Sequence, residues 1–244
     1  MKIHSFESMA AVDGEGIRVA VFFTGCPLRC VYCHNPDTWN GIGKEISTED
    51  LVKKISRYKT YFGDKGGVTF SGGEPLLHAR EINELYEGLE KLNINYALDT
   101  SGCVELNEDV KKSVENASMI ILDLKMWDDE SYEKYTGVSF KLIREFLKYA
   151  IMEKKRIWIR TVIVPGINDS TQILGKYIKN LKDVIGDGKI TDYIEKYQLL
   201  GFHTMGFFKY EELGIDNPLK DTKDLDVSKL KELQEYIDEC ISNC

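Results

Sequence analysis

Three cysteines lie within eight residues of one another, at the spacing C-x3-C-x2-C, as Cys26, Cys30 and Cys33. They follow an apolar, β-branched run at residues 17–23, which predicts a buried strand, and Thr24-Gly25 ends that run. The three thiols are therefore expected on one tight loop at the carboxyl end of a strand. Thiolates select soft metals and iron–sulfur clusters. On a [4Fe–4S] cluster, three thiolates leave one iron free to bind a small molecule through its amino and carboxylate groups.

Two other kinds of site can be built from the same residues. A zinc site would add His34 as its fourth ligand, although the adjacent Cys33 and His34 would have difficulty pointing at one metal ion. A thioredoxin-like redox pair would use Cys30 and Cys33, and it would leave Cys26 without a role. The cluster interpretation uses all three cysteines, and we prefer it for that reason.

Composition limits the class of protein. The 244 residues are 43 % hydrophobic and 30 % charged, with a formal net charge of −8, as is typical of a soluble globular protein. There is no basic stripe, so nucleic acid is not an expected partner. No apolar run approaches membrane-spanning length, and residues 1–6 lack the apolar core of a signal peptide. We therefore expect a cytoplasmic protein without disulfides. The remaining cysteines should be buried or terminal free thiols: Cys103, Cys240 and Cys244.

The chain alternates between strand-like and helix-like segments. Apolar runs predict six strands, at residues 17–23, 68–70, 94–98, 119–122, 157–164 and 193–200. Helices are predicted near residues 47–58, 78–92, 107–114, 129–135, 139–153, 170–185 and 230–240. Residues 1–16 are expected to precede the first strand, and residues 201–226 to be less regular. This alternation predicts an α/β fold with a parallel sheet in one domain over residues 1–244, either an open doubly wound sheet or a barrel.

Polar and glycine-rich residues follow these strands at the point where each strand ends. They are the cysteine loop, Gly72-Gly73-Glu74, Asp99-Thr100, Asp123-Leu124-Lys125, Pro165-Gly166 and His203. Because the carboxyl ends of parallel strands meet at one edge of a sheet, these residues should form one site. Taken singly, each motif also has a structural explanation. The glycines can form a plain turn, the aspartates can cap helices or form ion pairs, and a lone histidine is often structural.

The cysteine spacing, with Tyr32 before the third cysteine, and the sequence Gly72-Gly73-Glu74 together resemble the radical S-adenosylmethionine enzymes. This resemblance implies a partial (βα)6 barrel with parallel strands. It also implies a [4Fe–4S] cluster on Cys26, Cys30 and Cys33, with S-adenosylmethionine chelated to the open iron. In this family an electron from the cluster cleaves S-adenosylmethionine, and the resulting 5′-deoxyadenosyl radical abstracts a hydrogen atom.

The same resemblance implies roles for residues at the strand ends. The backbone of Gly72-Gly73 and the Glu74 side chain would hold the ammonium group of the cofactor. Lys125 would pair with its carboxylate, and His203 would contact its nucleoside end. A further group would line a monovalent cation site beside the cofactor or take ribose hydroxyls: Asp99, Thr100 and Asp123. The other residues that we assign to the cofactor site are Tyr32, Cys33, His34, Asn35, Leu124 and Arg160.

Two segments resemble one subgroup, the activases of pyruvate formate-lyase. The sequence DGEGIR at residues 13–18, together with IHSFES at residues 3–8, matches the amino terminus of that subgroup, with Glu15 in place of the usual proline. Residues 203–209 match its H-x-x-G-x-x-K pattern. In the subgroup, the residue that matches Asp13 meets the glycine loop of the protein substrate. Several other activases insert further cysteine clusters, whereas residues 34–70 contain no cysteine.

The resemblance implies an oxidoreductase of anaerobic glucose metabolism. It would remove a hydrogen atom from a glycine of pyruvate formate-lyase, with flavodoxin or ferredoxin as electron donor. No side chain would need to act as acid or base, and we expect a monomer. The alternative substrate is another glycyl radical enzyme, such as anaerobic ribonucleotide reductase. The alternatives from other classes are a zinc-stabilised binding module and a barrel that carries a cluster without catalysis.

Overall fold

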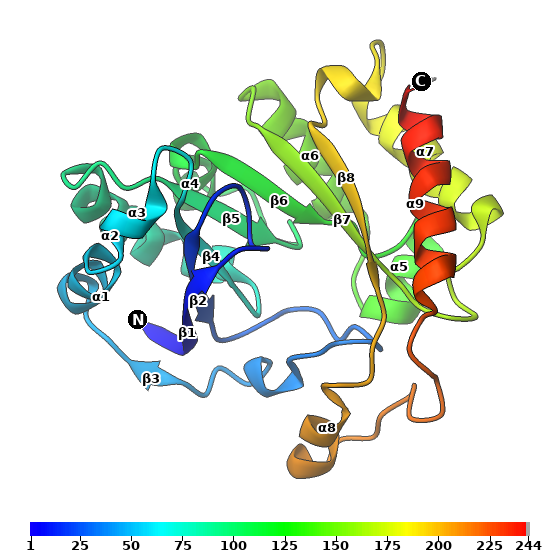
Figure 1. Ribbon diagram of the computed structural model, residues 1–244, viewed down its shortest axis with the longest axis horizontal. Coiled ribbons are helices and arrows are strands. Elements are labelled where there is room, and N and C mark those ends of the chain that lie inside the picture. Colours follow the sequence, from blue (N-terminus) through cyan, green and yellow to red (C-terminus); the bar gives the residue numbers. More distant parts are fainter. Residues whose placement is uncertain (243–244) are drawn as a thin grey trace.

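The computed structural model describes residues 1–242, and eight strands in this range form one sheet in the order β3-β1-β2-β4-β5-β6-β7-β8 (Figure 1). Neighbours from β2 through β8 are parallel, whereas β1 pairs antiparallel with both β2 and β3. The strands are β1 Lys2–Ala10, β2 Arg18–Phe23, β3 Lys44–Glu45, β4 Gly67–Gly72, β5 Tyr96–Thr100, β6 Met119–Asp123, β7 Ile157–Ile163 and β8 Lys196–Gly201.

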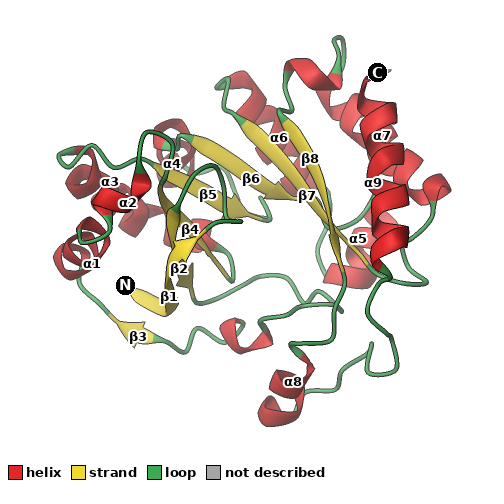
Figure 2. Cartoon of the chain, in the orientation of Figure 1, coloured by secondary structure: helices red, strands yellow, loops and turns green. Residues whose placement is uncertain are grey.

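Helices follow the parallel strands and pack on the outside of the sheet (Figure 2). The α-helices are α1 Thr48–Ser56, α2 Lys59–Phe62, α3 Ala79–Glu90, α4 Glu108–Asn116, α5 Asp129–Thr136, α6 Lys141–Met152, α7 Thr171–Ile185, α8 Phe207–Leu213 and α9 Val227–Ser242. Short 3-10 helices are η1 Pro36–Thr38, η2 Pro75–His78 and η3 Ile190–Asp192. The outermost strands β3 and β8 do not pair, so the sheet is open. The expected α/β fold and partial barrel with parallel strands are confirmed. Among the helices of residues 1–242, none combines the length and apolar character that crossing a membrane requires.

Four of the nine α-helices within residues 1–242 begin at a side-chain cap. The side chain of Ser47 accepts a hydrogen bond from the Asp50 backbone at the start of α1, as the sequence predicted. Asn107 and Ser170 cap α4 and α7 in the same way, and Asp128 forms a capping box with Ser131 at α5. These local signals explain why the helix boundaries were predictable to within a few residues.

Several strands depart from the sequence prediction: β1 and β3 were not predicted, and β4, β5 and β8 have shifted ends. Residues 2–10 form β1, although we expected residues 1–16 to precede the first strand. Of the residues of β1 only Ile3 is fully buried, so this strand lacks the apolar pattern by which the others were found. Strand β5 begins two residues later than predicted and runs to Thr100. Asp99 and Thr100 therefore belong to the strand itself, at its carboxyl end.

Buried Arg18 closes the end of the sheet opposite the cysteine loop. Its side chain is 1 % exposed and donates to the Thr69 hydroxyl at 2.8 Å, the Val68 carbonyl at 2.8 Å and the Asn95 side chain at 3.0 Å. It also donates to the Glu15 carbonyl at 3.2 Å, which holds the β1–β2 loop in place. Burial lowers the pKa of Arg18 to about 10, so the guanidinium remains charged at neutral pH.

Candidate active site

The three cysteines lie on a loop that leaves the carboxyl end of β2. Hydrogen bonds from Arg29 N to the Thr136 carbonyl at 2.8 Å and from Val31 N to the Tyr135 carbonyl at 3.0 Å fasten this loop to the end of α5. Gly25 N donates to the Thr38 carbonyl at 2.7 Å, which closes the loop on itself. The loop is therefore held by backbone contacts, whatever its thiols bind.

All three cysteines line one cavity of about 350 Å³ inside the half-barrel. The predicted site residues that line it are Asp13, Cys26, Cys30, Tyr32, Cys33, His34, Asn35, Gly72, Gly73, Asp99, Thr100, Asp123, Lys125 and Arg160. The cysteine loop, the glycine pair and the ends of β5 and β6 therefore meet at one cavity as expected, whereas Pro165 and Gly166 do not line it. Glu74, Leu124 and His203 lie outside the cavity lining.

Gly72 and Gly73 bring the β4 loop against the cysteine loop. A Cβ on Gly73 would lie 2.1 Å from the Gly25 carbonyl oxygen, and Gly72 has a φ of +118°, so neither position accepts a side chain. Gly73 N donates to the Phe23 carbonyl at 3.0 Å, and Glu74 N donates to the Gly25 carbonyl at 2.8 Å. The glycine pair leaves backbone exposed to the cavity beside Cys26, as a ligand with an ammonium group would require.

The Glu74 side chain does not line the cavity and is fully buried. Its carboxylate accepts from the Leu76 backbone at 3.1 Å, the Thr100 hydroxyl at 2.5 Å, and the Ser101 backbone and hydroxyl at 2.9 and 2.5 Å. Burial raises the pKa of Glu74, and the four donors oppose that shift. This geometry does not support the prediction that the Glu74 side chain holds a cofactor ammonium group. It ties the β4 and β5 loops together.

Asp99 and Arg160 form a polar pair with unsatisfied atoms at the cavity. Asp99 Oδ2 accepts from the Ser71 hydroxyl at 2.7 Å, while Asp99 Oδ1 lies 3.6 Å from Arg160 Nη1. Asp99 Oδ1 and Arg160 Nε are both buried without a hydrogen-bond partner. Burial raises the pKa of Asp99 to about 6. Unpaired buried polar atoms on a cavity wall indicate a missing polar ligand.

Lys125 is a second cation on the wall of the same cavity. The Lys125 ammonium pairs with the Asp123 carboxylate. Three tyrosine hydroxyls hold the Lys125 backbone. Its carbonyl accepts from Tyr32 at 3.2 Å and from Tyr177 at 3.0 Å, and its amide donates to Tyr132 at 2.9 Å. Burial would lower the pKa of Lys125, but Asp123 and other acidic groups outweigh burial and raise it. Lys125 is thus a fixed, permanent positive charge that suits a carboxylate.

The segment 203–209 packs on the residues that follow Cys33. The rings of His203 and His34 stack with centroids 3.9 Å apart, and His34 Nε2 donates to the His203 carbonyl at 2.9 Å. Lys209 Nζ donates to Asn35 at 2.8 Å and lies 3.0 Å from Asp37. The His203 ring is therefore stacked on His34 and does not line the cavity in which a nucleoside would bind. His203 Nδ1 is buried without a partner, beside the cavity residue His34.

Asp13 reaches the cavity from the β1–β2 loop, which folds over the inner face of the sheet. Its carbonyl accepts from the Thr69 hydroxyl at 2.5 Å, and the neighbouring Val12 carbonyl accepts from Arg160. Sequence reasoning missed eight further lining residues: Phe22, Leu28, Thr38, Trp39, Ser71, Ser101, Val162 and Leu200. Ser71 adjoins the glycine motif and could have been found from it. The apolar residues carried no signal apart from their place at strand ends.

The cysteines fit a cluster better than a single ion. Within residues 1–242, no three His, Cys, Asp or Glu side chains converge as ligands of one metal ion, and tetrahedral zinc would need such convergence. In a cluster each cysteine binds a different iron, so the sulfurs can be farther apart. Burial raises the pKa of Cys26 to about 12 and raises those of Cys30 and Cys33, so metal binding must displace the thiol protons. Cys103 and Cys240 are free thiols, and Cys244 lies outside the described residues.

Replacing Glu74 should weaken the junction of the loops. Glu74→Gln keeps the shape but turns an amide N–H toward two of the four donors, so the free energy of unfolding should fall by about 1–3 kcal/mol. Urea titration of the cluster-free protein measures this loss. Glu84→Gln, on the exposed side of α3, is the matched control and should change stability by less than about 0.5 kcal/mol. Equal stability of the two variants would contradict the assignment.

Asp99 should make stability depend on pH. Its raised pKa means that the folded protein binds this proton more tightly than the unfolded chain does. The stabilisation is complete below about pH 4 and is lost as the pH rises to about 6. The unfolding free energy of the wild type, relative to that of Asp99→Asn, should therefore fall by roughly 1–3 kcal/mol between about pH 4 and pH 7. Denaturant titrations at several pH values test this, and a difference independent of pH would refute it.

Comparison with known sequences agrees with this geometry. Residues 20–174 match the family model of the radical SAM superfamily. The pyruvate formate-lyase-activating enzyme of Clostridium pasteurianum is 42 % identical over 246 residues, which cover 98 % of this chain and 98 % of that enzyme. The pyruvate formate-lyase 1-activating enzyme of Escherichia coli is 38 % identical over 228 residues, which cover 91 % of this chain and 89 % of that enzyme.

Solved structures share the fold. The Streptococcus suis protein SuiB, bound to its precursor peptide SuiA, has a TM-score of 0.67 at 16 % identity, over 92 % of this chain and 46 % of SuiB. A domain of a pyruvate-formate lyase-activating enzyme from Bacteroides vulgatus has a TM-score of 0.54 at 19 % identity, over 72 % of this chain and 94 % of that domain. At these identities the likeness concerns the fold alone. The sequence matches, taken with the cysteine loop and its cavity, show that the chain belongs to the radical SAM superfamily and, within it, to the family of the pyruvate formate-lyase-activating enzymes.

Proposed function

We propose that this protein is the activase of a pyruvate formate-lyase. A [4Fe–4S] cluster with S-adenosylmethionine bound supplies the radical that takes one hydrogen atom from a glycine of that protein substrate. The observation that carries the proposal is the meeting of three cysteines, the glycine pair and Lys125 on one cavity, in a chain 42 % identical to such an activase. The relatives do not favour the alternative of a ribonucleotide reductase activase.

The cavity residues divide between the two cofactors. Cys26, Cys30 and Cys33 would hold the cluster and leave one iron open, and no nearby side chain of the loop replaces the missing ligand because His34 is engaged with His203. The backbone beside Gly73 would take the ammonium group of S-adenosylmethionine, and Lys125 its carboxylate. The two contacts come from different segments, the turn after β4 and the end of β6, so they would orient the ligand as well as hold it.

The acidic residues have two candidate roles in the same space. Asp99 has one free buried oxygen, which can accept from a ribose hydroxyl or bind a monovalent cation. Asp123 has one oxygen on Lys125, and the Thr100 hydroxyl already donates to Glu74 and accepts from Gly102 N at 2.9 Å. Lys125 and Arg160 already match the charges of Asp123 and Asp99, so a cation in this place would depend on the free Asp99 oxygen. We keep the cation as part of the proposal on that free oxygen.

The protein substrate would reach the cavity at Asp13. The β1–β2 loop carries Asp13 to the cavity wall, so a glycine loop entering there would meet its carboxylate next to the cofactor space. A flavodoxin or ferredoxin would supply the electron. We place the reaction in anaerobic glucose metabolism in the cytoplasm, and we expect the activase to act as a monomer.

The test is formation of a glycyl radical in the substrate. The anaerobically reconstituted and reduced protein is incubated with S-adenosylmethionine and pyruvate formate-lyase, and an electron paramagnetic resonance doublet should appear. Cys30→Ala should abolish the doublet because a cluster ligand is lost, whereas Cys103→Ala, at a buried thiol outside the cavity, should keep it. Methionine production without a doublet would show cleavage of S-adenosylmethionine but exclude this substrate.

Lys125 should decide the affinity for S-adenosylmethionine. Lys125→Met removes the cation that would face the cofactor carboxylate, and the dissociation constant should rise at least about tenfold, equivalent to about 1.4 kcal/mol. Binding is measured by titrating the reconstituted protein with S-adenosylmethionine and following the cluster spectrum. Lys148→Met, on the exposed face of α6, controls for loss of a lysine. Unchanged affinity in Lys125→Met would remove this residue from the site.

A further inference from the structure

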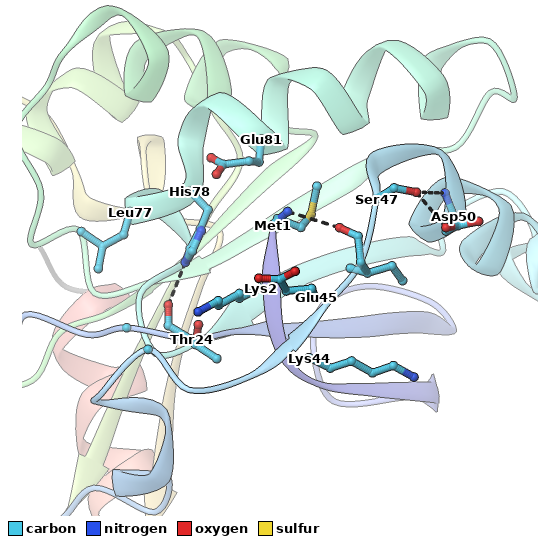
Figure 3. Close-up of a pocket in the computed structure, with 13 residues that line it drawn as sticks. Met1, Lys2, Thr24, Lys44, Glu45, Ser47, Asp50, Leu77, His78 and Glu81 are labelled. Atoms are coloured by element: carbon cyan, nitrogen blue, oxygen red, sulfur yellow. Dashed lines mark hydrogen bonds between the residues drawn. The ribbon is translucent and has the colours of Figure 1, made fainter.

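A second hollow of about 980 Å³ opens on the outer surface next to the cysteine loop (Figure 3). One wall is formed by the start of β1 and by β3, with Lys2, Lys44 and Glu45. The facing wall is formed by η2 and the first turn of α3, with Leu77, His78 and Glu81. Thr24 and Gly25 lie between these walls, and the start of α1 adds Ser47 and Asp50. The proposed function assigns nothing to this hollow.

The hollow and the cavity are lined by adjacent residues of the cysteine loop. Gly25 lines the outer hollow, and the next residue, Cys26, lines the cavity; consecutive Cα atoms are only about 3.8 Å apart. His78 Nε2 donates to the Thr24 carbonyl at 2.7 Å, and its ring stacks on Phe23 with centroids 4.9 Å apart. The wall is therefore thin and firmly held. A molecule that contacts Gly25 from the hollow lies one residue from Cys26, a ligand of the proposed cluster.

The reaction proposed above needs one electron from outside in each cycle. The cavity must then hold S-adenosylmethionine and admit the substrate glycine, so an electron carrier cannot use the same entrance at the same time. A third hollow, around Arg18 and Asn95, lies at the opposite ends of the strands. Because electron transfer slows steeply with distance, the hollow at Gly25 is the better placed of the two.

The lining of the hollow combines an exposed apolar side chain with charged ones. Leu77 lines the hollow and is 52 % exposed. Charged residues of both signs line it as well: Lys2, Lys44, Glu45, Asp50 and Glu81. Short-lived redox complexes bury small areas and have an apolar centre with a polar rim. A rim of mixed charge can align a partner without holding it permanently.

We propose that this hollow is the docking surface of a small one-electron-carrier protein, which delivers its electron across Thr24-Gly25. The proposal rests on the proposed function and names the partner and its place. One electron leaves the reduced carrier, which is oxidised, and reduces the cluster by one electron; no proton or atom is transferred. Leu77 and Lys44 are contact residues for the carrier and have no part in binding S-adenosylmethionine.

The experiment compares two reductants on the reconstituted protein. The rate of cluster reduction is followed by the loss of visible absorbance after rapid mixing with reduced flavodoxin or reduced ferredoxin, and separately with dithionite. Leu77→Asp and Lys44→Glu should slow reduction by at least one of the carriers tenfold or more, and should leave reduction by dithionite unchanged. Met152→Asp, at a position 64 % exposed on α6, should change neither rate.

A competing entrance is the exposed face of the cysteine loop itself. Arg29 lies there, with its guanidinium 5.0 Å from the centre of the Trp39 ring. If Arg29→Glu slows the carriers while Leu77→Asp and Lys44→Glu do not, the docking surface is at Arg29 and the proposal is wrong. It is also wrong if the hollow variants change the Michaelis constant for pyruvate formate-lyase and not the rate of the carriers.

The two proposals can fail separately. With dithionite as the reductant, the hollow variants should still form the glycyl radical at the wild-type level. Loss of that radical in the wild type would overturn the proposed function, whereas equal carrier rates in wild type and hollow variants would overturn only the docking surface. Slower reduction of the hollow variants by dithionite would show a disturbed cluster site, and would also count against the docking proposal.

Discussion

The site depends on the close approach of two backbone segments, Gly72-Gly73 and Phe23–Gly25. Two hydrogen bonds join them, and a side chain on Gly73 would overlap the Gly25 carbonyl. The buried Glu74 carboxylate then fixes the same turn to Thr100 and Ser101 through four donors. Three strand ends are thus joined at one point. The position of Cys26 relative to the rest of the cavity follows from that junction.

The cavity wall carries more charge than a protein core normally tolerates. Asp99, Asp123, Lys125 and Arg160 lie around it, and two of their polar atoms have no partner. Burying such groups is unfavourable unless they are paired. S-adenosylmethionine carries an ammonium, a carboxylate and ribose hydroxyls, so it offers partners of both kinds. Under the proposed function, S-adenosylmethionine would supply partners for these groups, so its binding would make their burial favourable.

The two hollows near the end of β2 are proposed to have different functions: the inner one binds the cofactor and substrate, and the outer one binds the electron carrier. The inner one faces the concave side of the sheet, where the β1–β2 loop and Asp13 lie. The outer one faces solvent beside β3 and η2. The segment 203–209 covers neither; it packs against His34 and Asp37 and holds the end of the cysteine loop. Under both proposals, a cluster held by Cys26 would receive its electron from the side of the outer hollow, while S-adenosylmethionine and the substrate glycine would occupy the inner one.

The sequence by itself determined the cysteine loop, the glycine turn and the alternation of strands with helices. These are local features: ligand spacing, glycine pairs, capping residues and apolar periodicity are all readable within about a dozen residues. The parallel sheet followed from them, and so did the meeting of most site residues, because parallel strands end at one edge. Strand β1 was missed since it is half exposed and has little apolar pattern.

Only the tertiary structure decided what each polar side chain faces. Glu74 was expected to bind a ligand. Its partners Thr100 and Ser101 lie 26 and 27 residues further along the chain, and no local pattern predicts these contacts. His203 stacks on His34 across 169 residues, and the outer hollow is assembled from four separate segments. Spacing in a sequence fixes which groups can share a site, whereas the packing of distant segments fixes which of them remain free to bind.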